Sequence, residues 1–435
     1  MIFFTLLNLA AYPAILTISA VFFTRYFRLK LINPLTVVLG ASLPTTLVTS
    51  LVGPAVILDG GLFNPYFQYA LLVANVHELL RTLTLIVLVR YITEKKVFAR
   101  LVERASRLGG PAKPSSMRTA SLLFLGLYVI FFVLLAQHSF GVIEWIKDPR
   151  TGYQLHRTGA GQWYALAITS LSTSLVLATV YARSSWTVLV VTPVYLALIY
   201  LLGSKGLVIF FGTYIVVILS IQEYKYLHLV TTVVAGAAAL LVVFNFIAAF
   251  GSADLNNLAS YTDGFTNASH YYQRYLDGSL PLYNGQVFFS NFWGLVPRTL
   301  YPDKPYVYGS VMVGEVFYPG AAALTNTPAF ATIEYFADFG WIGVILFAVV
   351  NPATVITTFL YAILLPHLRT LNVFAGGHHS RVITYATLLL LAPSFLAFFD
   401  FPNNLILLAV ILGSIDVVNR LRFSAPTEVA VEKAE

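Results

Sequence analysis

The sequence predicts an all-α integral membrane protein of about eleven transmembrane helices, from its composition, its long apolar stretches and the placement of its charges. Of the 435 residues, 58% are hydrophobic and only 10% are charged, and the mean hydropathy is +0.78. A water-soluble domain of this length could not solvate such a surface. A transmembrane helix needs about 20 consecutive apolar residues. Stretches of that kind recur along most of the chain, so one helical membrane domain is expected.

The longest interruption of the apolar stretches is a polar and aromatic segment. The predicted spans are roughly 2–23, 34–58, 66–89, 119–137, 163–181, 186–202, 206–221, 229–249, 341–364, 382–400 and 404–418. They divide the chain into residues 1–249 with the first eight spans, a large external loop at 250–338, and residues 339–435 with three spans and the tail. The loop is expected to contain short helices. The first stretch is too long for a signal peptide and lacks a basic start, so it is expected to be a span.

Basic residues follow every odd-numbered span, which predicts the orientation of the chain. The most basic segment is the loop 90–118 after the third span. Because cytoplasmic loops are enriched in Lys and Arg, we expect the N-terminus outside and the C-terminus in the cytoplasm. This loop is expected to form an amphipathic helix that binds anionic lipid, and a regulatory site is the alternative. The net charge of +7 therefore reflects topology and not a nucleic-acid partner.

Seven basic residues fall on the predicted outer side, against the charge rule, so each needs another reason to be there. They are Lys147, Arg150, Arg157, Lys205, Arg274, Arg298 and Lys304. Lys205 lies in the tight turn GSKG between two spans. An anionic substrate at the outer membrane surface would explain such a set of cations.

The shorter outer loop, 138–162, carries Arg150 and Arg157 in the sequence DPRTGYQLHRTGAGQWY. Arginine presents a planar fork of donors that matches phosphate oxygens two at a time. Two arginines on a short turn-rich loop would suit a pyrophosphate-linked lipid. The alternative is that they pair with Glu144 and Asp148 at the rim of the loop.

The large loop begins with tyrosines at helical spacing in the sequence SYTDGFTNASHYYQRYLDG. Tyrosine favours the membrane interface, so anchoring is one interpretation. The other is that Tyr271 and Tyr275 stack on sugar rings. His270 and Arg274 stand among them. A neutral histidine is a possible general base near pH 7.

A proline-rich stretch follows, NFWGLVPRTLYPDKPYVYG, and its prolines exclude a regular helix. It holds Arg298 and Lys304 on a rigid segment beside Trp293 and Tyr301. We expect Arg298 to contact an anionic substrate and the two aromatic rings to stack on sugars. Lys304 is expected to bind the same anion, unless Asp303 neutralises it.

Two acidic residues, Glu334 and Asp338, lie four positions apart just before the ninth predicted span. This spacing places them on one helical face. Like-charged neighbours raise the pKa of one of them, which would suit acid–base catalysis. The alternative is a pair of solvated acids at a helix start.

The third span contains its own polar cluster, Asn75, His77, Glu78 and Arg81, on one side of the predicted helix. Ionisable groups inside a membrane are costly and usually functional. A Glu78–Arg81 pair that joins helices is the alternative, and the sequence alone favours it.

The sequence motifs of several enzyme classes are absent. No HExxH, P-loop, GxSxG or Asp-rich metal motif is present, which counts against an ATPase, a metalloprotease, a serine hydrolase and a nucleotide-sugar enzyme. The absence of cysteine excludes disulfides, thiolate metal sites and cysteine nucleophiles.

The span pattern and the segments DPRTGYQLHRTGAG, VPRTLYPDKP and TPAFATIEYFADFGWIG resemble the Wzy-type oligosaccharide repeat-unit (O-antigen) polymerases of bacterial envelopes. That family is similar in architecture to O-antigen ligases. The resemblance implies a GT-C-like bundle and a glycosyltransferase that needs no metal or other cofactor. Such an enzyme transfers a glycan from undecaprenyl pyrophosphate to a lipid-linked repeat unit, at the periplasmic leaflet of the inner membrane. The implied partners are the lipid-linked oligosaccharide, the bilayer, a flippase and a chain-length regulator.

The resemblance also assigns residues. Arg150 and Arg157 match the arginines of the family's short loop, and Arg298 and Lys304 match its Pro-Arg and Lys-Pro positions. His270 lies in the large loop, where the ligases carry an important histidine.

Three alternative functions remain: a transporter or flippase for lipid-linked oligosaccharide, an O-antigen ligase, and a structural scaffold. Transporters bind at the bilayer midplane and show inverted repeats, whereas the polar aromatic residues here gather outside. A scaffold leaves the external cations unexplained.

Overall fold

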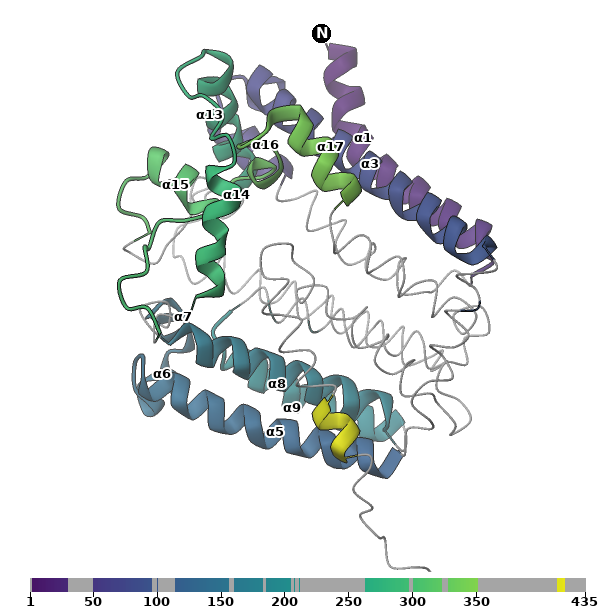
Figure 1. The fold of residues 1–435 in the computed structure, drawn as a ribbon, viewed down its shortest axis with the longest axis vertical. Helices are drawn as coiled ribbons and strands as arrows, with labels where there is room; N and C mark the ends of the chain where they lie inside the picture. The colour runs from purple at the N-terminus through teal and green to yellow at the C-terminus, as the bar shows by residue number, and fades with distance from the viewer. Residues whose placement is uncertain are drawn as a thin grey trace, which may run out of the picture.

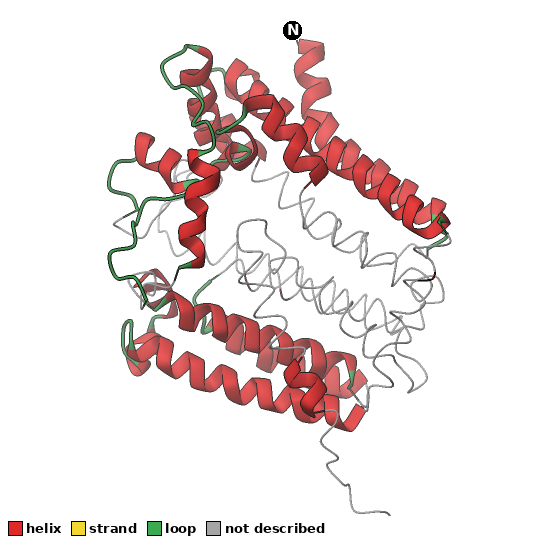
Figure 2. Cartoon of the chain, viewed as in Figure 1, coloured by secondary structure: helices red, strands yellow, loops and turns green. Residues whose placement is uncertain are grey.

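The computed structural model describes residues 2–29, 50–95, 100, 114–155, 160–182, 185–204, 207, 211, 263–296, 300–322, 328–350 and 413–418. In this part of the chain every regular element is a helix, as predicted (Figure 2). The seventh, eighth and tenth predicted spans lie almost wholly outside the described residues. The count of eleven spans therefore stays a prediction.

Three described helices are long and apolar enough to cross a membrane: α1 (Ile2–Tyr26), α3 (Pro65–Glu94) and the part Ser115–Gln137 of α5 (Pro114–Gln137). They confirm helices at the first, third and fourth predicted spans. Helices α8 (Gly161–Val180) and α9 (Ser185–Tyr200) lie over the fifth and sixth, and α17 (Gly340–Val350) begins the ninth.

Helix α3 contacts α1, α13 and α17. It begins at a strong cap, because the side chain of Asn64 accepts hydrogen bonds from the N–H groups of Tyr66 and Phe67, and Pro65 takes the first helical position. Its 30 residues correspond to about 45 Å, more than the ~30 Å hydrocarbon core of a bilayer. One end of α3 therefore extends beyond the membrane core.

The long helices form two groups (Figure 1). In the first group, α1 and α3 run side by side in the same direction. The amide of Asn8 donates to the carbonyl of Gln68, at 2.8 Å, and near the other end the hydroxyl of Tyr26 donates to Glu94, at 3.2 Å. In the second group, α5 packs along α8, and α9 lies against α8. Small polar residues let α5 and α8 approach closely. Ser121 and Ser174 each donate a hydroxyl to the other's carbonyl, at 2.8 and 2.6 Å.

The short helices of both predicted outer loops lie at the same end of the long helices (Figure 1). They are α6 (Val142–Lys147), α7 (Pro149–Leu155), α13 (Gly264–Leu276), α14 (Gln286–Ser290), the 3₁₀ helix η4 (Asn291–Leu295), α15 (Val311–Phe317) and α16 (Ile333–Phe336). A further 3₁₀ turn, η1 (Gly61–Phe63), precedes α3 at this end. Helices α13, α16 and α17 pack on the first group through one apolar core with α3.

We predict that Ser174→Ala weakens the pairing of α5 and α8, because the hydroxyl of Ser174 bonds Ser121 and also contacts the hydroxyl of Tyr195. Interhelical hydrogen bonds in membrane proteins contribute about 0.6 kcal/mol on average and up to about 1.7 kcal/mol. Thermal unfolding in detergent should show a loss in this range. Ser172→Ala is the control, because that hydroxyl bonds the Ile168 carbonyl of its own helix. Equal melting temperatures for the two variants would contradict the prediction.

Candidate functional site

Arg150 lies exposed on α7 and keeps its charge available. Its guanidinium carbon lies 5.3 Å from the ring centre of Tyr153. Asp148 caps the same helix, since its carboxylate accepts the N–H of Thr151 at 3.1 Å and the hydroxyl at 2.7 Å. These bonds lower the pKa of Asp148. Among the described residues no carboxylate pairs with Arg150. For Arg150 the structure therefore does not show the alternative of pairing with Glu144 or Asp148, and for Arg157 that alternative lies outside the described residues.

Helix α7 is fixed in place by close packing. Trp145 of α6 is fully buried and donates its indole N–H to the carbonyl of Leu201, at 2.6 Å. Gly152 packs against the face of that indole, where a Cβ would collide with the ring. Gly203, with φ +72°, lies against the carbonyl of Pro149 in the same way. Two other predicted cations, Arg157 and Lys205, lie outside the described residues.

His270 is exposed on α13. Partial burial, and to a lesser extent the charge of Arg274, lowers the pKa of its imidazole. Arg274 lies one turn further along α13, with its guanidinium carbon 4.7 Å from the ring centre of Phe317. A neutral imidazole can accept a proton, so His270 remains a candidate base.

The two tyrosines predicted to stack on sugars have different surroundings. Tyr271 is fully buried, with the rings of Tyr272 and Tyr275 at centroid distances of 5.3 and 6.5 Å. A sugar cannot stack on a covered ring, and this placement argues against the predicted role of Tyr271. Tyr275 is only partly buried.

Trp293 and Tyr301 form an aromatic surface in the proline-rich segment. Their rings stack at 5.5 Å and 24°, and Tyr301 is 45% exposed. Aromatic faces of this kind can stack on a sugar ring, and the predicted role of this pair stays a prediction.

Lys304 has a different environment from the one expected of a phosphate ligand. The residue is only 8% exposed, and its ammonium donates to the carbonyl of Val296 at 3.0 Å and lies 4.8 Å from the ring centre of Tyr308. A buried ammonium needs such partners. The geometry thus favours a structural role for Lys304, which closes the loop from 296 to 304. Arg298, inside this loop, lies outside the described residues.

Glu334 and Asp338 do not share a helical face, so that prediction is wrong. Helix α16 ends at Phe336, and a turn leads to Gly340, which has φ +56° and starts α17. Asp338 is buried, and its two carboxylate oxygens accept the N–H groups of Val287 and Phe288 at the start of α14. Glu334 is exposed. The fold therefore uses Asp338 as a tether and leaves Glu334 accessible.

Tyr335, the residue after Glu334, contacts the polar cluster of the third span. Its ring stacks on His77 of α3, with ring centroids 3.8 Å apart and planes 5° apart. Arg81 and Glu78 pair with each other on α3, at 2.6 Å, so this pair does not itself join two helices. The sequence pattern indicated these polar residues of α3 as a candidate cluster but did not indicate Tyr335. No spacing in the sequence connects positions 77 and 335.

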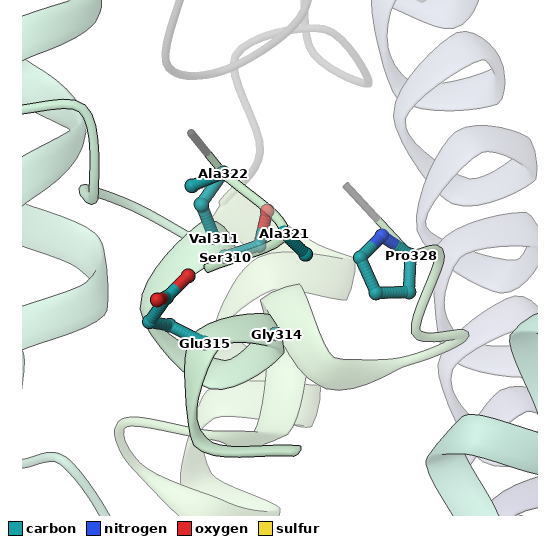
Figure 3. Close-up of a pocket in the computed structure, with 7 residues that line it drawn as sticks. All are labelled: Ser310, Val311, Gly314, Glu315, Ala321, Ala322 and Pro328. Atoms are coloured by element: carbon teal, nitrogen blue, oxygen red, sulfur yellow. The ribbon is translucent and has the colours of Figure 1, made fainter. Parts of the chain in front are cut away.

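The described residues contain a small polar pocket beside α15, lined by Ser310, Gly314, Glu315 and Pro328 among others (Figure 3). Its volume is about 50 Å³, far below the roughly 300–1,000 Å³ typical of ligand pockets. It can hold water but not a sugar ring. No group of three potential metal ligands converges within the described part of the chain.

Two O-antigen polymerases resemble this chain. They come from Salmonella typhimurium and Salmonella typhi, and each is 28% identical over 235 residues, which cover 52% of this chain and 55% of the relative. The chain thus spans about half the length of the curated relatives it matches. No family model matches the chain, and no solved structure does.

We predict opposite outcomes for the same chemical change at the two acids. Asp338→Asn should lower the melting temperature, because one oxygen that accepts a backbone N–H is replaced by a donor, which costs about 1–3 kcal/mol in a buried site. Glu334→Gln should leave melting unchanged, because this side chain is exposed. Thermal unfolding of both variants in detergent measures the difference. A large loss for Glu334→Gln with none for Asp338→Asn would reverse the assignment.

Proposed function

We propose that this protein is a membrane glycosyltransferase that polymerises lipid-linked oligosaccharide repeat units into a bacterial surface polysaccharide. The similarity to two O-antigen polymerases over 235 residues carries the proposal. The site adds chemical support. Arg150 and Glu334 are exposed, and the rings of Trp293 and Tyr301 stack on each other. Helices α7 and α16, which carry the two charged residues, lie at the same end of the long helices (Figure 1).

The substrate chemistry follows from these groups. Cleavage of a glycosyl–pyrophosphate bond leaves negative charge on the departing undecaprenyl pyrophosphate, and arginine stabilises such charge. Arg150 supplies one guanidinium, and Arg298 is proposed to supply another. The acceptor hydroxyl needs a base within hydrogen-bond reach. Glu334 is proposed for this role over Asp338, whose oxygens are occupied, and His270 is the second candidate.

The reaction is proposed to occur at the periplasmic leaflet, with the loops 138–162 and 250–338 outside. The support is the excess of Lys and Arg in the opposite loops. The chain lacks cysteine, so single cysteines can be introduced and labelled with an impermeant maleimide in whole cells. A cysteine at Leu280 should be labelled, and one at Gly110 should not. The reverse pattern would overturn the orientation.

The experiment that tests the function is incubation of the purified protein with an undecaprenyl-pyrophosphate repeat unit, without nucleotide sugar and with a chelator. A gel should show a ladder of glycans on the lipid carrier. Unchanged glycan length would contradict the proposal and favour a flippase. Transfer only to a lipid A core acceptor would favour a ligase.

We predict that Arg298→Lys loses most of the polymerisation rate, because lysine keeps the charge but not the fork. Loss of one donor to a developing anion costs about 3–4 kcal/mol, or roughly a hundredfold or more in rate. Arg150→Lys in the same assay tests whether the short loop shares the site. Near-normal polymer from Arg298→Lys, with collapsed expression of Arg298→Ala, would make Arg298 a structural residue.

A further inference from the structure

An open groove runs along the half of α1 that lies farthest from the short helices (Figure 1). Its volume is about 590 Å³, within the roughly 300–1,000 Å³ typical of ligand pockets. Among the described residues, its lining comes from α1: Thr17, Ile18, Val21, Phe22, Arg25 and Tyr26. The apolar members recur at helical spacing on one exposed face. The groove is therefore mostly apolar and ends at the cation Arg25.

Basic residues gather at this end of α1 and α3. Four are exposed: Arg25 and Arg28 of α1, and Arg90 and Lys95 of α3. The guanidinium carbon of Arg90 lies 5.7 Å from the ring centre of Tyr26, so the two helices bring their charges together. Glu94 pairs with Arg90, at 3.0 Å. Within the described part of the chain no carboxylate pairs with Arg25 or Arg28, so both guanidinium groups can accept an anionic partner.

Arg28 occupies a backbone position that glycine usually takes. Helix α1 ends in a left-handed cap, in which the N–H of Leu29 donates to the carbonyl of Thr24 at 2.8 Å. Arg28 has φ +55° in this cap. Glycine is favoured there because a side chain is strained in the left-handed region. Strain at a residue of this kind marks a candidate functional position. Here the strained residue adds a second guanidinium next to the end of the groove.

The length of the groove matches one leaflet of a bilayer. From Thr17 to Tyr26 the helix rises about 14 Å, and half of a hydrocarbon core of ~30 Å is about 15 Å. Helix α1 is long and apolar enough to cross a membrane. When the cations lie at the level of the phosphate groups, the apolar part of the groove therefore lies at the depth of the acyl chains.

We propose that this groove is a binding site for an anionic phospholipid. An acyl chain lies along Ile18, Val21 and Phe22, and the headgroup phosphate contacts Arg25 and Arg28. Guanidinium groups match phosphate oxygens with pairs of N–H donors, and basic pockets at the ends of transmembrane helices bind anionic headgroups. The site does not depend on the proposed polymerase function, because it lies at the opposite end of the long helices from α7 and α16 (Figure 1).

Two other accounts of this face explain less. The excess of basic residues on the cytoplasmic side explains the charges, but neither the groove nor the strained position of Arg28. A second copy of the chain would form a two-fold interface, in which the same patch meets itself. Arg25 and Arg28 of the two copies would then repel each other. A lipid with one negative charge and long apolar chains fits both parts of the groove.

The test is native mass spectrometry of the purified full chain in detergent, with added phosphatidylglycerol or with phosphatidylcholine of the same acyl chains. We expect tighter binding of phosphatidylglycerol. Arg25→Gln and Arg28→Gly should each weaken its binding about fivefold, the contribution of one basic residue at an anionic lipid surface. Binding of phosphatidylcholine should not change. Lys147→Gln is the control, because it removes one exposed positive charge at the other end of the helices.

Two variants separate binding from folding and headgroup from chain. Glycine suits the φ of Arg28, so Arg28→Gly should melt at the same or a higher temperature than the wild type while it loses the lipid. Val21→Trp fills the groove from an exposed position, so it should weaken the binding of both lipids.

Each part of the proposal has an outcome that overturns it. Equal binding of the two lipids by the wild type overturns the headgroup site, and so does wild-type binding by Arg25→Gln and Arg28→Gly. An equal loss for Lys147→Gln would reveal a general effect of net charge and would overturn it too. Unchanged binding by Val21→Trp overturns the groove. Dimers that exclude lipid would assign this face to a second copy instead.

Discussion

The arrangement of the site depends on the aromatic contact between α3 and the large loop. Trp341 donates its indole N–H to the hydroxyl of Tyr69, at 2.9 Å, and the ring of Tyr69 also contacts Tyr272 and Phe336, at 5.1 and 6.1 Å. Aromatic pairs contribute about 0.5–1.5 kcal/mol each beyond their buried area. Here one residue of a membrane helix joins α13, α16 and α17. Because α16 is fixed in this way, the backbone that carries Glu334 has a defined position beside α3.

The polar groups discussed here are of two kinds: those buried and bonded to the backbone, and those exposed at the surface. Lys304 and Asp338 are buried, and each is bonded to backbone groups of its own loop. Burial of these charges is favourable only because those bonds are made. Arg150 and Glu334 are exposed, and no ion pair neutralises either of them among the described residues. The chemistry that remains possible at this end of the membrane helices therefore depends on the exposed residues Arg150 and Glu334.

Local patterns in the sequence predicted the helical class and the spans at α1, α3 and α5. These features depend on hydropathy and on residues close together in the chain. The different environments of Glu334, which is exposed, and Asp338, which is buried, could not be predicted. They depend on a turn before Gly340 that interrupts the helix. The contact between His77 and Tyr335 was equally hidden, since only the tertiary packing of α16 on α3 creates it. Burial of Lys304 likewise follows from loop closure and not from its neighbours in sequence.

The most direct test of this account is a cryo-EM structure of the Glu334→Gln variant trapped with an undecaprenyl-pyrophosphate repeat unit. The account predicts the acceptor hydroxyl within about 3 Å of the residue 334 side chain. It also predicts the pyrophosphate against Arg150. A glycan bound away from α16, with its hydroxyl facing another base such as His270, would contradict the account.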